Sequence, residues 1–142
     1  MTRIDFYIDA PDKLAVAAKL VGKARGNHHK VLIYSPDETT ARAIDRLLWT
    51  TPPTGFVPHC MAHDPLAAET PVLITRRPEE LPHDDVLLNL DREWPPSFAR
   101  FHRVLEIVGD DEDDKAAARA RFRFYRDRGY EIKTHNLAAS EG

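Results

Sequence analysis

Three stretches of this chain carry side chains whose types and spacing could support chemistry. His59-Cys60-x-x-His63 has ligand types and a spacing that zinc accepts. Asp110–Asp114 is an unbroken run of carboxylates that could chelate a divalent cation. Between Arg119 and Arg126, arginines alternate with aromatic side chains. This third pattern suits an acidic ligand that carries an apolar anchor.

The first two stretches have simpler explanations than a metal site. A structural zinc site needs four ligands, and His83 is the only obvious addition nearby. Carboxylates directly before a helix stabilise the positive end of its dipole, so Asp110–Asp114 is expected at a helix start. Nothing in the sequence argues for a nucleophilic triad. We therefore expect no metal, no cofactor and no catalytic site.

The arginine-aromatic stretch is expected to lie on the last helix of the chain. At 100° per residue, one arc is the predicted core face: Ala117, Ala120 and Phe124. The opposite arc gathers the candidate ligand-binding residues: Arg119, Phe122, Arg123 and Arg126, with Tyr125 at its border. No Asp or Glu between Lys115 and Arg126 can pair with these arginines. The alternative is a solvated face whose arginine stems cover apolar surface.

The segment Leu47–His59 combines large apolar side chains with prolines. Prolines rule out a helix interior and a central strand. The segment therefore either returns to the core or presents a rigid apolar patch to a partner, and we favour the patch. Its candidate docking residues are Trp49, Pro52, Phe56, Val57 and Pro58.

Alternating strands and helices must position these stretches. Continuous apolar or β-branched runs predict strands at Ile4–Ile8, Val31–Tyr34, Val72–Thr75, Val86–Leu90, Val104–Val108 and Tyr130–Thr134. Helices are expected from Pro11 to Gly22–Gly26, from Ser35 (as cap) to Leu48, and from Asp113 or Asp114 to Gly129, with a short helical turn at Ser97–Phe101. This order predicts a three-layer α/β/α domain with a mostly parallel, Rossmann-like sheet.

A nucleotide site is not expected in this fold. The first strand-to-helix turn, Asp9-Ala10-Pro11-Asp12, has no glycine to admit a phosphate, and its carboxylates would repel one. The second turn, Ser35-Pro36-Asp37-Glu38, has the same defects.

Composition bounds the class of protein. The 142 residues fit one domain, expected over residues 1–136 with a frayed tail at 137–142. One cysteine suits a reducing compartment, and neither a secretory signal nor an apolar run of roughly 20 residues is present, so a cytoplasmic protein without a membrane anchor is expected. The net charge of −3 hides a basic stretch, Lys115–Lys133, that follows the acidic run. This asymmetry favours a local acidic ligand over general nucleic-acid binding.

Three groups of residues resemble the chi subunit family of bacterial DNA polymerase III. The first comprises Asp45, Leu48-Trp49, Pro52 and Phe56-Val57-Pro58-His59, the second is the opening strand Ile4–Ile8, and the third runs from Ala118 to Tyr130. The resemblance spans nearly the whole chain in order. It implies a non-catalytic accessory subunit that links the clamp loader to protein-coated single-stranded DNA and contacts DNA mainly indirectly.

The resemblance also assigns partners to the two candidate surfaces. Arg119, Phe122, Arg123 and Arg126, with Tyr125 adjacent, fall on positions that bind the acidic C-terminal tail of single-stranded DNA-binding protein, which ends in Pro-Phe. The docking residues from Trp49 to Pro58 fall on positions that bind the psi subunit, or here another clamp-loader subunit. Two other classes stay open: an α/β nucleotide-dependent enzyme, and a module that binds nucleic acid directly through Lys115–Lys133.

Overall fold

The computed structural model describes residues 2–50, 58–67, 70–77 and 83–138. These residues form one sheet of seven strands in the order β3-β4-β2-β5-β6-β1-β7, and every neighbouring pair is parallel. The strands are β1 (Arg3–Ala10), β2 (Val31–Tyr34), β3 (His59–Met61), β4 (Val72–Thr75), β5 (Val86–Asn89), β6 (Arg103–Gly109) and β7 (Glu131–Asn136). No helix of the described part is long and apolar enough to cross a membrane.

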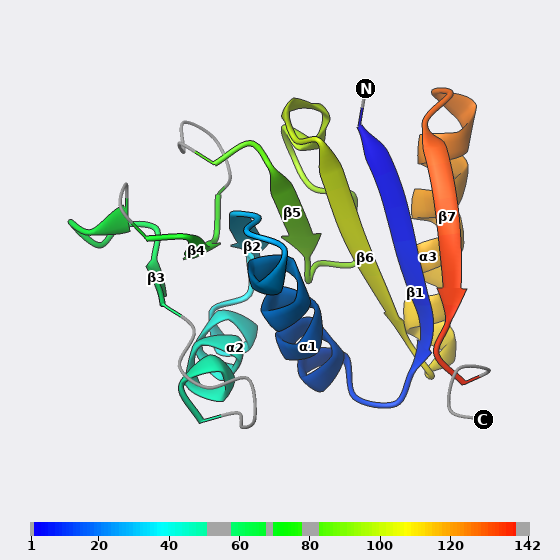
Figure 1. The fold of residues 1–142 in the computed structure, drawn as a ribbon. Helices are drawn as coiled ribbons and strands as arrows, with labels where there is room; N and C mark the ends of the chain where they lie inside the picture. Colours follow the sequence, from blue (N-terminus) through cyan, green and yellow to red (C-terminus); the bar gives the residue numbers. More distant parts are fainter. Residues whose placement is uncertain (1, 51–57, 68–69, 78–82, 139–142) are drawn as a thin grey trace.

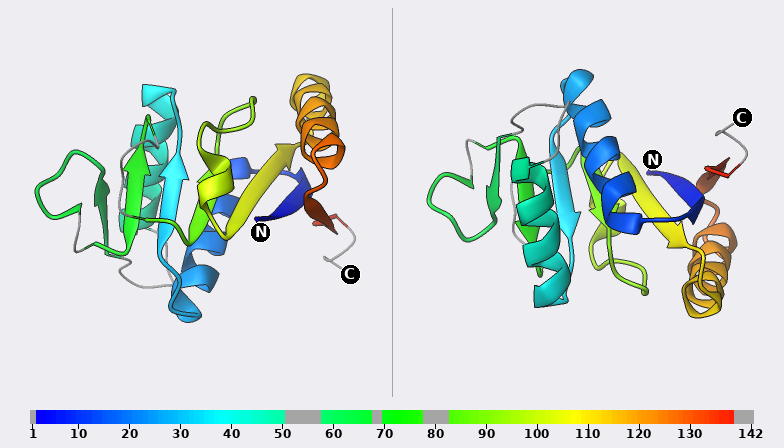
Figure 2. Two further views of the ribbon diagram at one scale, coloured as in Figure 1. Left: turned by 90° about the horizontal axis from the view of Figure 1, so that it is seen from above. Right: turned by 90° about the horizontal axis from the view of Figure 1, so that it is seen from below.

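Helices cover both faces of the sheet, as Figures 1 and 2 show. Helices α1 (Lys13–Gly26) and α2 (Glu38–Thr50) lie on one face, and α3 (Glu112–Asp127) lies on the other. The 3-10 helix η2 (Phe98–Arg100) contributes Phe98 to the core on the α3 side. The predicted three-layer α/β/α fold is therefore confirmed.

Strand β2 carries only large apolar or aromatic residues because both of its faces are buried. In β2, Val31 and Ile33 belong to the core under α1 and α2, whereas Leu32 and Tyr34 belong to the core on the α3 side. All four residues are buried. The continuous apolar run that predicted this strand is thus a consequence of two packed layers.

Two details of the local predictions are wrong. Asp37, not Ser35, caps α2, because its Oδ2 accepts the Thr40 N–H at 2.9 Å while the Ser35 hydroxyl donates to the Asp37 carbonyl. The edge strand β3 was not expected, since the run His59–Met61 is only three residues long and follows a proline-rich segment. Its place beside β4 brings the end of that segment against α2.

The last strand, β7, pairs with β1 along its whole length. Beyond it, the Leu137 N–H donates to the Ile8 carbonyl at 3.1 Å, and Leu137 packs partly against the core under α1 and α2. The predicted tail therefore does not fray at its first residue. Its last part, 139–142, lies outside the described residues.

The chain changes direction between the neighbouring strands β1 and β6. From β1 it continues into α1 on one face, and from β6 it continues into α3 on the opposite face. Ligands of open parallel sheets bind outside the carboxyl ends of strands at such points. Asp9, at this end of β1, has a left-handed backbone with φ 58°, and the pairing register of β1 with β6 shifts beside it. The fold thus places an irregular strand end next to the start of α3.

Candidate functional site

Helix α3 begins in a carboxylate-rich turn, as predicted, but with a different cap. The Asp111 carboxylate accepts the Asp114 N–H at 3.1 Å, so Asp111 is the N-cap in place of the predicted Asp113 or Asp114. Asp114 instead points inward, where it accepts the Gly109 N–H at 2.6 Å and the Lys13 ammonium at 3.1 Å. One carboxylate therefore joins the start of α3, the end of β6 and the start of α1.

The helix ends where the sequence predicts. Gly129 has φ 80°, a conformation that glycine adopts without strain, and its N–H donates to the Arg126 carbonyl at 3.0 Å. The Tyr130 N–H reaches back to the Tyr125 carbonyl at 3.1 Å. The turn directs the chain into β7, which closes one side of the site described below.

The core face of α3 is not the predicted one. Its buried residues are Asp114, Ala118, Arg121 and Tyr125, whereas Ala120 is exposed and Phe124 is half-buried. Phe124 stacks on Trp94 with ring centroids 3.8 Å apart. It therefore packs against the segment before η2. The apolar periodicity of the sequence predicted the wrong face because a charged residue, Arg121, occupies the centre of the face that is buried.

Arg121 is buried because a buried carboxylate receives it. Its Nε donates to Glu106 Oε1 of β6 at 3.0 Å, and its Nη1 donates to the Arg92 carbonyl at 2.6 Å. Glu106 also accepts the Tyr125 hydroxyl at 2.6 Å and the Asn89 amide at 2.9 Å. Burial raises the pKa of Glu106, and the charge of Arg121 and these hydrogen bonds oppose that rise. The network attaches α3 to the sheet at one rotation about its axis.

That rotation leaves a stripe of cations on the outer side of α3. Arg119, Arg123 and Arg126 are exposed, as predicted. Phe122 is half-buried, because its ring packs against Phe6 of β1 with centroids 5.7 Å apart. The three arginines are therefore at the surface of α3, and Phe122 reaches it only in part.

Tyr125 needs a correction. Its side chain is fully buried and its hydroxyl is bonded to Glu106, so it offers no surface to a ligand. Burial, followed by the nearby Glu106 carboxylate, raises the pKa of Tyr125, so the phenol stays protonated as the donor. Tyr125 supports the helix from inside and is not a contact residue in this conformation.

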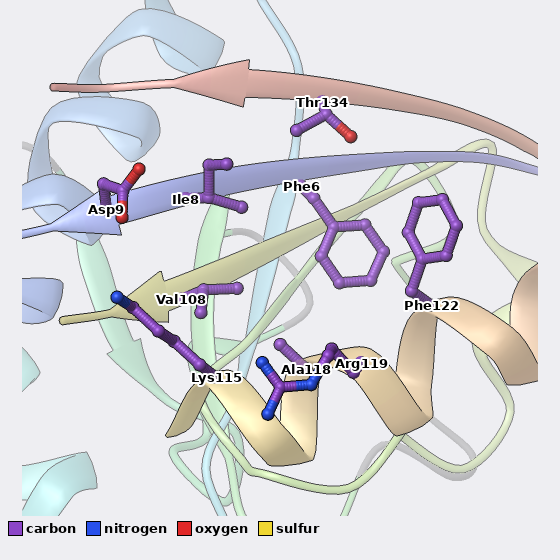
Figure 3. A pocket seen from close by; sticks show the side chains of 9 residues that line it. All are labelled: Phe6, Ile8, Asp9, Val108, Lys115, Ala118, Arg119, Phe122 and Thr134. Atoms are coloured by element: carbon purple, nitrogen blue, oxygen red, sulfur yellow. The ribbon is translucent and has the colours of Figure 1, made fainter. Parts of the chain in front are cut away.

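A pocket of about 420 Å³ lies between α3 and strands β1, β6 and β7 (Figure 3). We call it the α3 pocket, and its lining is Phe6, Ile8, Asp9, Val108, Lys115, Ala118, Arg119, Phe122 and Thr134. Phe6, Ile8, Val108, Ala118 and Phe122 make most of the wall apolar, while Lys115 and Arg119 bring two cations from α3. Asp9 lies across from α3 on the strand side. The pocket can hold an apolar group beside a carboxylate.

Sequence reasoning identified only part of this pocket. It selected Arg119 and Phe122 but missed Lys115 and the strand residues, of which Phe6 and Ile8 alternate on one face of β1. That alternation was the available signal, because it marks the face that meets α3. Arg123 and Arg126 do not line the pocket and extend the cationic stripe along the helix instead.

The predicted docking residues are placed only in part. Trp49 has 55% of its surface exposed, and Pro58 is exposed. Pro52, Phe56 and Val57 lie outside the described residues. Beneath Trp49 is His59, whose ring centroid lies 4.7 Å from that of Trp49 and whose Nε2 lies 3.3 Å from Asp45 Oδ1. The buried His59 thus supports the exposed Trp49 at the end of α2.

The described residues contain no group of three or more His, Cys, Asp or Glu side chains placed to hold a metal ion. His59 and His63 differ in their environments, since His59 is buried and His63 is exposed. The partners of His59 are Asp45 and Trp49, which are parts of α2. We therefore assign His59 a packing role.

Comparison with known proteins gives one consistent result. The family described as DNA polymerase III chi subunit, HolC, matches residues 1–133. A Pseudomonas aeruginosa protein named DNA polymerase III subunit chi is 36% identical over 141 residues, which cover 96% of this chain and 98% of the relative. Proteins of the same name from Haemophilus influenzae and Escherichia coli are 31% and 30% identical, covering 86% and 74% of this chain and 85% and 72% of the relatives. This chain belongs to the DNA polymerase III chi subunit family.

Proposed function

We propose that this chain is a non-catalytic adaptor of the replicative polymerase in the cytoplasm, with two protein partners. One partner is the acidic C-terminal tail of single-stranded DNA-binding protein, bound at the α3 pocket. The other is psi or another clamp-loader subunit, docked at the surface around Trp49. Membership of the chi family makes the chain an accessory subunit of the polymerase. The α3 pocket and the surface around Trp49 are the two candidate sites at which such a subunit could bind its partners.

The α3 pocket is the observation that carries the tail-binding proposal. A tail that ends in Pro-Phe presents an aromatic side chain and a terminal carboxylate on one residue. The pocket offers a matching pair, an apolar wall that includes Phe6 and Phe122 and the cations Lys115 and Arg119. Its volume of about 420 Å³ lies within the roughly 300–1,000 Å³ typical of ligand pockets.

The remaining cations extend the site beyond the pocket. Arg123 and Arg126 are exposed on the same side of α3, where the acidic residues before the Pro-Phe end would pass. Their contribution is long-range attraction, which salt screens over about 8–10 Å. Asp9 places a negative charge on the strand side of the pocket. The peptide carboxylates are therefore expected on the α3 side.

The proposed docking surface depends on a pre-positioned aromatic residue. Trp49 is more than half exposed and rests on the buried His59 ring, so little side-chain entropy is lost when a partner covers it. Exposed tryptophans that are held in place often dominate protein interfaces. This arrangement supports the proposed partner binding at Trp49.

Calorimetric titration of the whole chain with a synthetic acidic peptide ending in Pro-Phe tests the tail proposal. Binding is expected for that peptide, and loss of binding is expected when the final Phe is removed or its carboxylate is amidated. Oligothymidylate and ATP are the two comparison ligands, because they represent direct nucleic-acid binding and a nucleotide enzyme. If the chain binds oligothymidylate tightly and does not bind the peptide, it is a nucleic-acid-binding module. If it binds ATP tightly and does not bind the peptide, it is a nucleotide-dependent enzyme.

A further inference from the structure

A second pocket, which we call the α2 groove, lies between α2 and the carboxyl ends of β3 and β4. Its volume is about 900 Å³. Its lining is Pro36, Glu38, Ala41, Arg42, Asp45, Met61, Ala62, His63, Ile74, Thr75, Arg76 and Arg77. Figures 1 and 2 show α2 beside β3 and β4 at this end of the sheet, far from α3. The groove is therefore separate from the α3 pocket.

The charges of the groove are arranged with its acids already partnered. Glu38 Oε1 accepts Arg42 Nη2 at 2.6 Å, and Asp45 Oδ1 lies 3.3 Å from His59 Nε2. Arg76 and Arg77 face the same groove from the end of β4 and have no ion-pair partner among the described residues. Asp37 lies near Arg76, whose charge adds to the Thr40 hydrogen bonds in lowering the pKa of that carboxyl, so the positive charge on the β4 side of the groove is compensated only in part.

Local hydrogen bonds hold Arg76 through its guanidinium group and Arg77 through its backbone. Arg76 Nε donates to the Pro36 carbonyl at 3.0 Å, which holds its stem against the turn before α2. The Thr75 hydroxyl donates to the Arg77 carbonyl at 2.6 Å and accepts the Arg77 N–H at 3.0 Å. The backbone that carries both guanidinium groups is therefore pre-positioned at the mouth of the groove.

The groove is continuous with Trp49 along one face of α2. Glu38, Arg42, Asp45 and Trp49 recur at helical spacing, so their side chains lie on one stripe. Asp45 belongs to both regions, because it lines the groove and contacts His59, which packs under Trp49. Arg76 is hydrogen-bonded to Pro36 in the turn before α2, and Glu38 at the start of α2 is eleven positions before Trp49, which is about 17 Å along a helix.

We propose that a single segment of the clamp-loader partner covers both regions, with an apolar side chain on Trp49 and carboxylates at Arg76 and Arg77. This inference rests on the proposed docking function and adds the chemistry of the partner: an apolar anchor followed at about 17 Å by acidic residues. Guanidinium groups bind carboxylates through paired hydrogen bonds, which favours Asp or Glu at these points.

A peptide segment fits this surface better than a nucleic-acid strand. Glu38 and Asp45 line the groove together with the arginines, so its charges alternate in sign and do not form the evenly basic track that suits a phosphate backbone. A peptide, unlike a nucleic-acid strand, can carry its negative charges at selected positions, here opposite Arg76 and Arg77. The groove wall also includes Ala41, Met61 and Ile74, which suit aliphatic side chains.

The test measures binding of the whole chain to the purified clamp-loader complex of the same bacterium. The variants are Trp49→Ala, Arg76→Glu with Arg77→Glu, and Lys19→Glu with Lys23→Glu as a matched double charge reversal on an exposed part of α1 outside the groove. We expect the Arg76/Arg77 reversal to weaken binding on the order of tenfold or more and to flatten its salt dependence. The α1 double reversal is expected to leave both unchanged, and urea unfolding confirms that each variant folds.

Three other results would overturn one proposal or the other. If Trp49→Ala weakens binding and the Arg76/Arg77 reversal behaves like the α1 double reversal, the acidic segment is wrong and the docking function stands. If neither changes binding, the docking function itself is wrong. Displacement of the clamp loader by oligothymidylate from wild type, but not from the Arg76/Arg77 variant, would assign the groove to nucleic acid instead.

Discussion

Arg121 of α3 and Glu106 of β6 form an ion pair at 3.0 Å inside the domain, and the two side chains are 1% and 0% exposed. The pair is completed by the Tyr125 hydroxyl, the Asn89 amide and the Arg92 carbonyl. Arg121 Nη2 is buried without a hydrogen-bond partner in the described residues. A helix that presents a stripe of exposed cations outward is thus held to the sheet by a cation that points inward.

Removing one member of this pair should destabilise the fold strongly. Arg121→Ala leaves the Glu106 carboxylate buried and uncompensated, which typically costs about 3–5 kcal/mol. Replacing both residues by apolar side chains of similar size, Glu106→Leu with Arg121→Met, should restore much of that loss. Urea unfolding of the three proteins measures both effects. A loss below about 1 kcal/mol for Arg121→Ala would show that the pair lies open to water.

Asp114 should make the stability of the domain sensitive to acid. Burial alone would raise the pKa of this carboxyl, but the Gly109 N–H and the Lys13 ammonium outweigh it, and the pKa lies below its ordinary value of 3.8. A carboxyl with a depressed pKa in the folded state stabilises the fold above the pKa of the unfolded chain. That stabilisation is lost as the pH falls below about 4.

The variant Asp114→Asn isolates this effect. It should be less stable than wild type near pH 7, and the difference in the free energy of unfolding should shrink as the pH falls below about 4. Asp113→Asn is the control, because Asp113 is exposed in the same helical turn. Urea unfolding at a series of pH values provides the measurement. A constant difference between wild type and Asp114→Asn across that range contradicts the assignment.

The strands were predictable because their sequence signal is local. Val31–Tyr34 and Val72–Thr75 consist of apolar, aromatic or β-branched residues, and every residue of both strands is buried. Between β5 and β6 the chain forms the short 3-10 helix η2, where a helical turn was expected. The residue types alone were enough to predict these elements, without knowledge of their tertiary contacts.

The α3 pocket and the polar core were less predictable because they depend on distant residues. Phe6 and Phe122 meet across more than one hundred positions of sequence, and nothing near either one reveals the contact. Arg121 has the composition of a surface residue and becomes a core residue only because Glu106 lies opposite it. Tyr125 was misassigned for the same reason, since its hydroxyl partner lies on another element.

Trp49 should be replaceable without loss of the fold. More than half of its surface is exposed, so Trp49→Ala removes packing mainly against His59 and is expected to cost about 1 kcal/mol or less. A core tryptophan would cost about 3–5 kcal/mol. Urea unfolding of the isolated chain measures the change, and Ile44→Ala, in the buried stripe of α2, provides the core comparison. Equal losses for the two variants would remove Trp49 from the docking surface.

The tail site predicts a different result for neighbouring residues of α3. Arg119→Glu with Arg123→Glu should weaken binding of a peptide ending in Pro-Phe by about 1.5–3 kcal/mol for each charge-assisted hydrogen bond that the reversal removes. Phe122→Ala should also weaken it, because the ring forms part of the pocket wall beside Phe6. The charge reversal should in addition reduce the dependence of affinity on salt. Calorimetric titration at two salt concentrations gives both quantities, with Lys19→Glu, exposed on α1, as the matched charge control.

Tyr125→Phe separates contact with the peptide from support of the helix. It removes only the hydroxyl that donates to Glu106 at 2.6 Å, so the free energy of unfolding should fall by about 1–3 kcal/mol. Peptide affinity should stay at the wild-type value at temperatures where the variant is folded, because the ring is fully buried and still fills its place. The opposite result, weaker peptide binding with unchanged stability, would return Tyr125 to the ligand surface. It would also mean that α3 binds its ligand in a rotation different from the one that Glu106 and Arg121 fix.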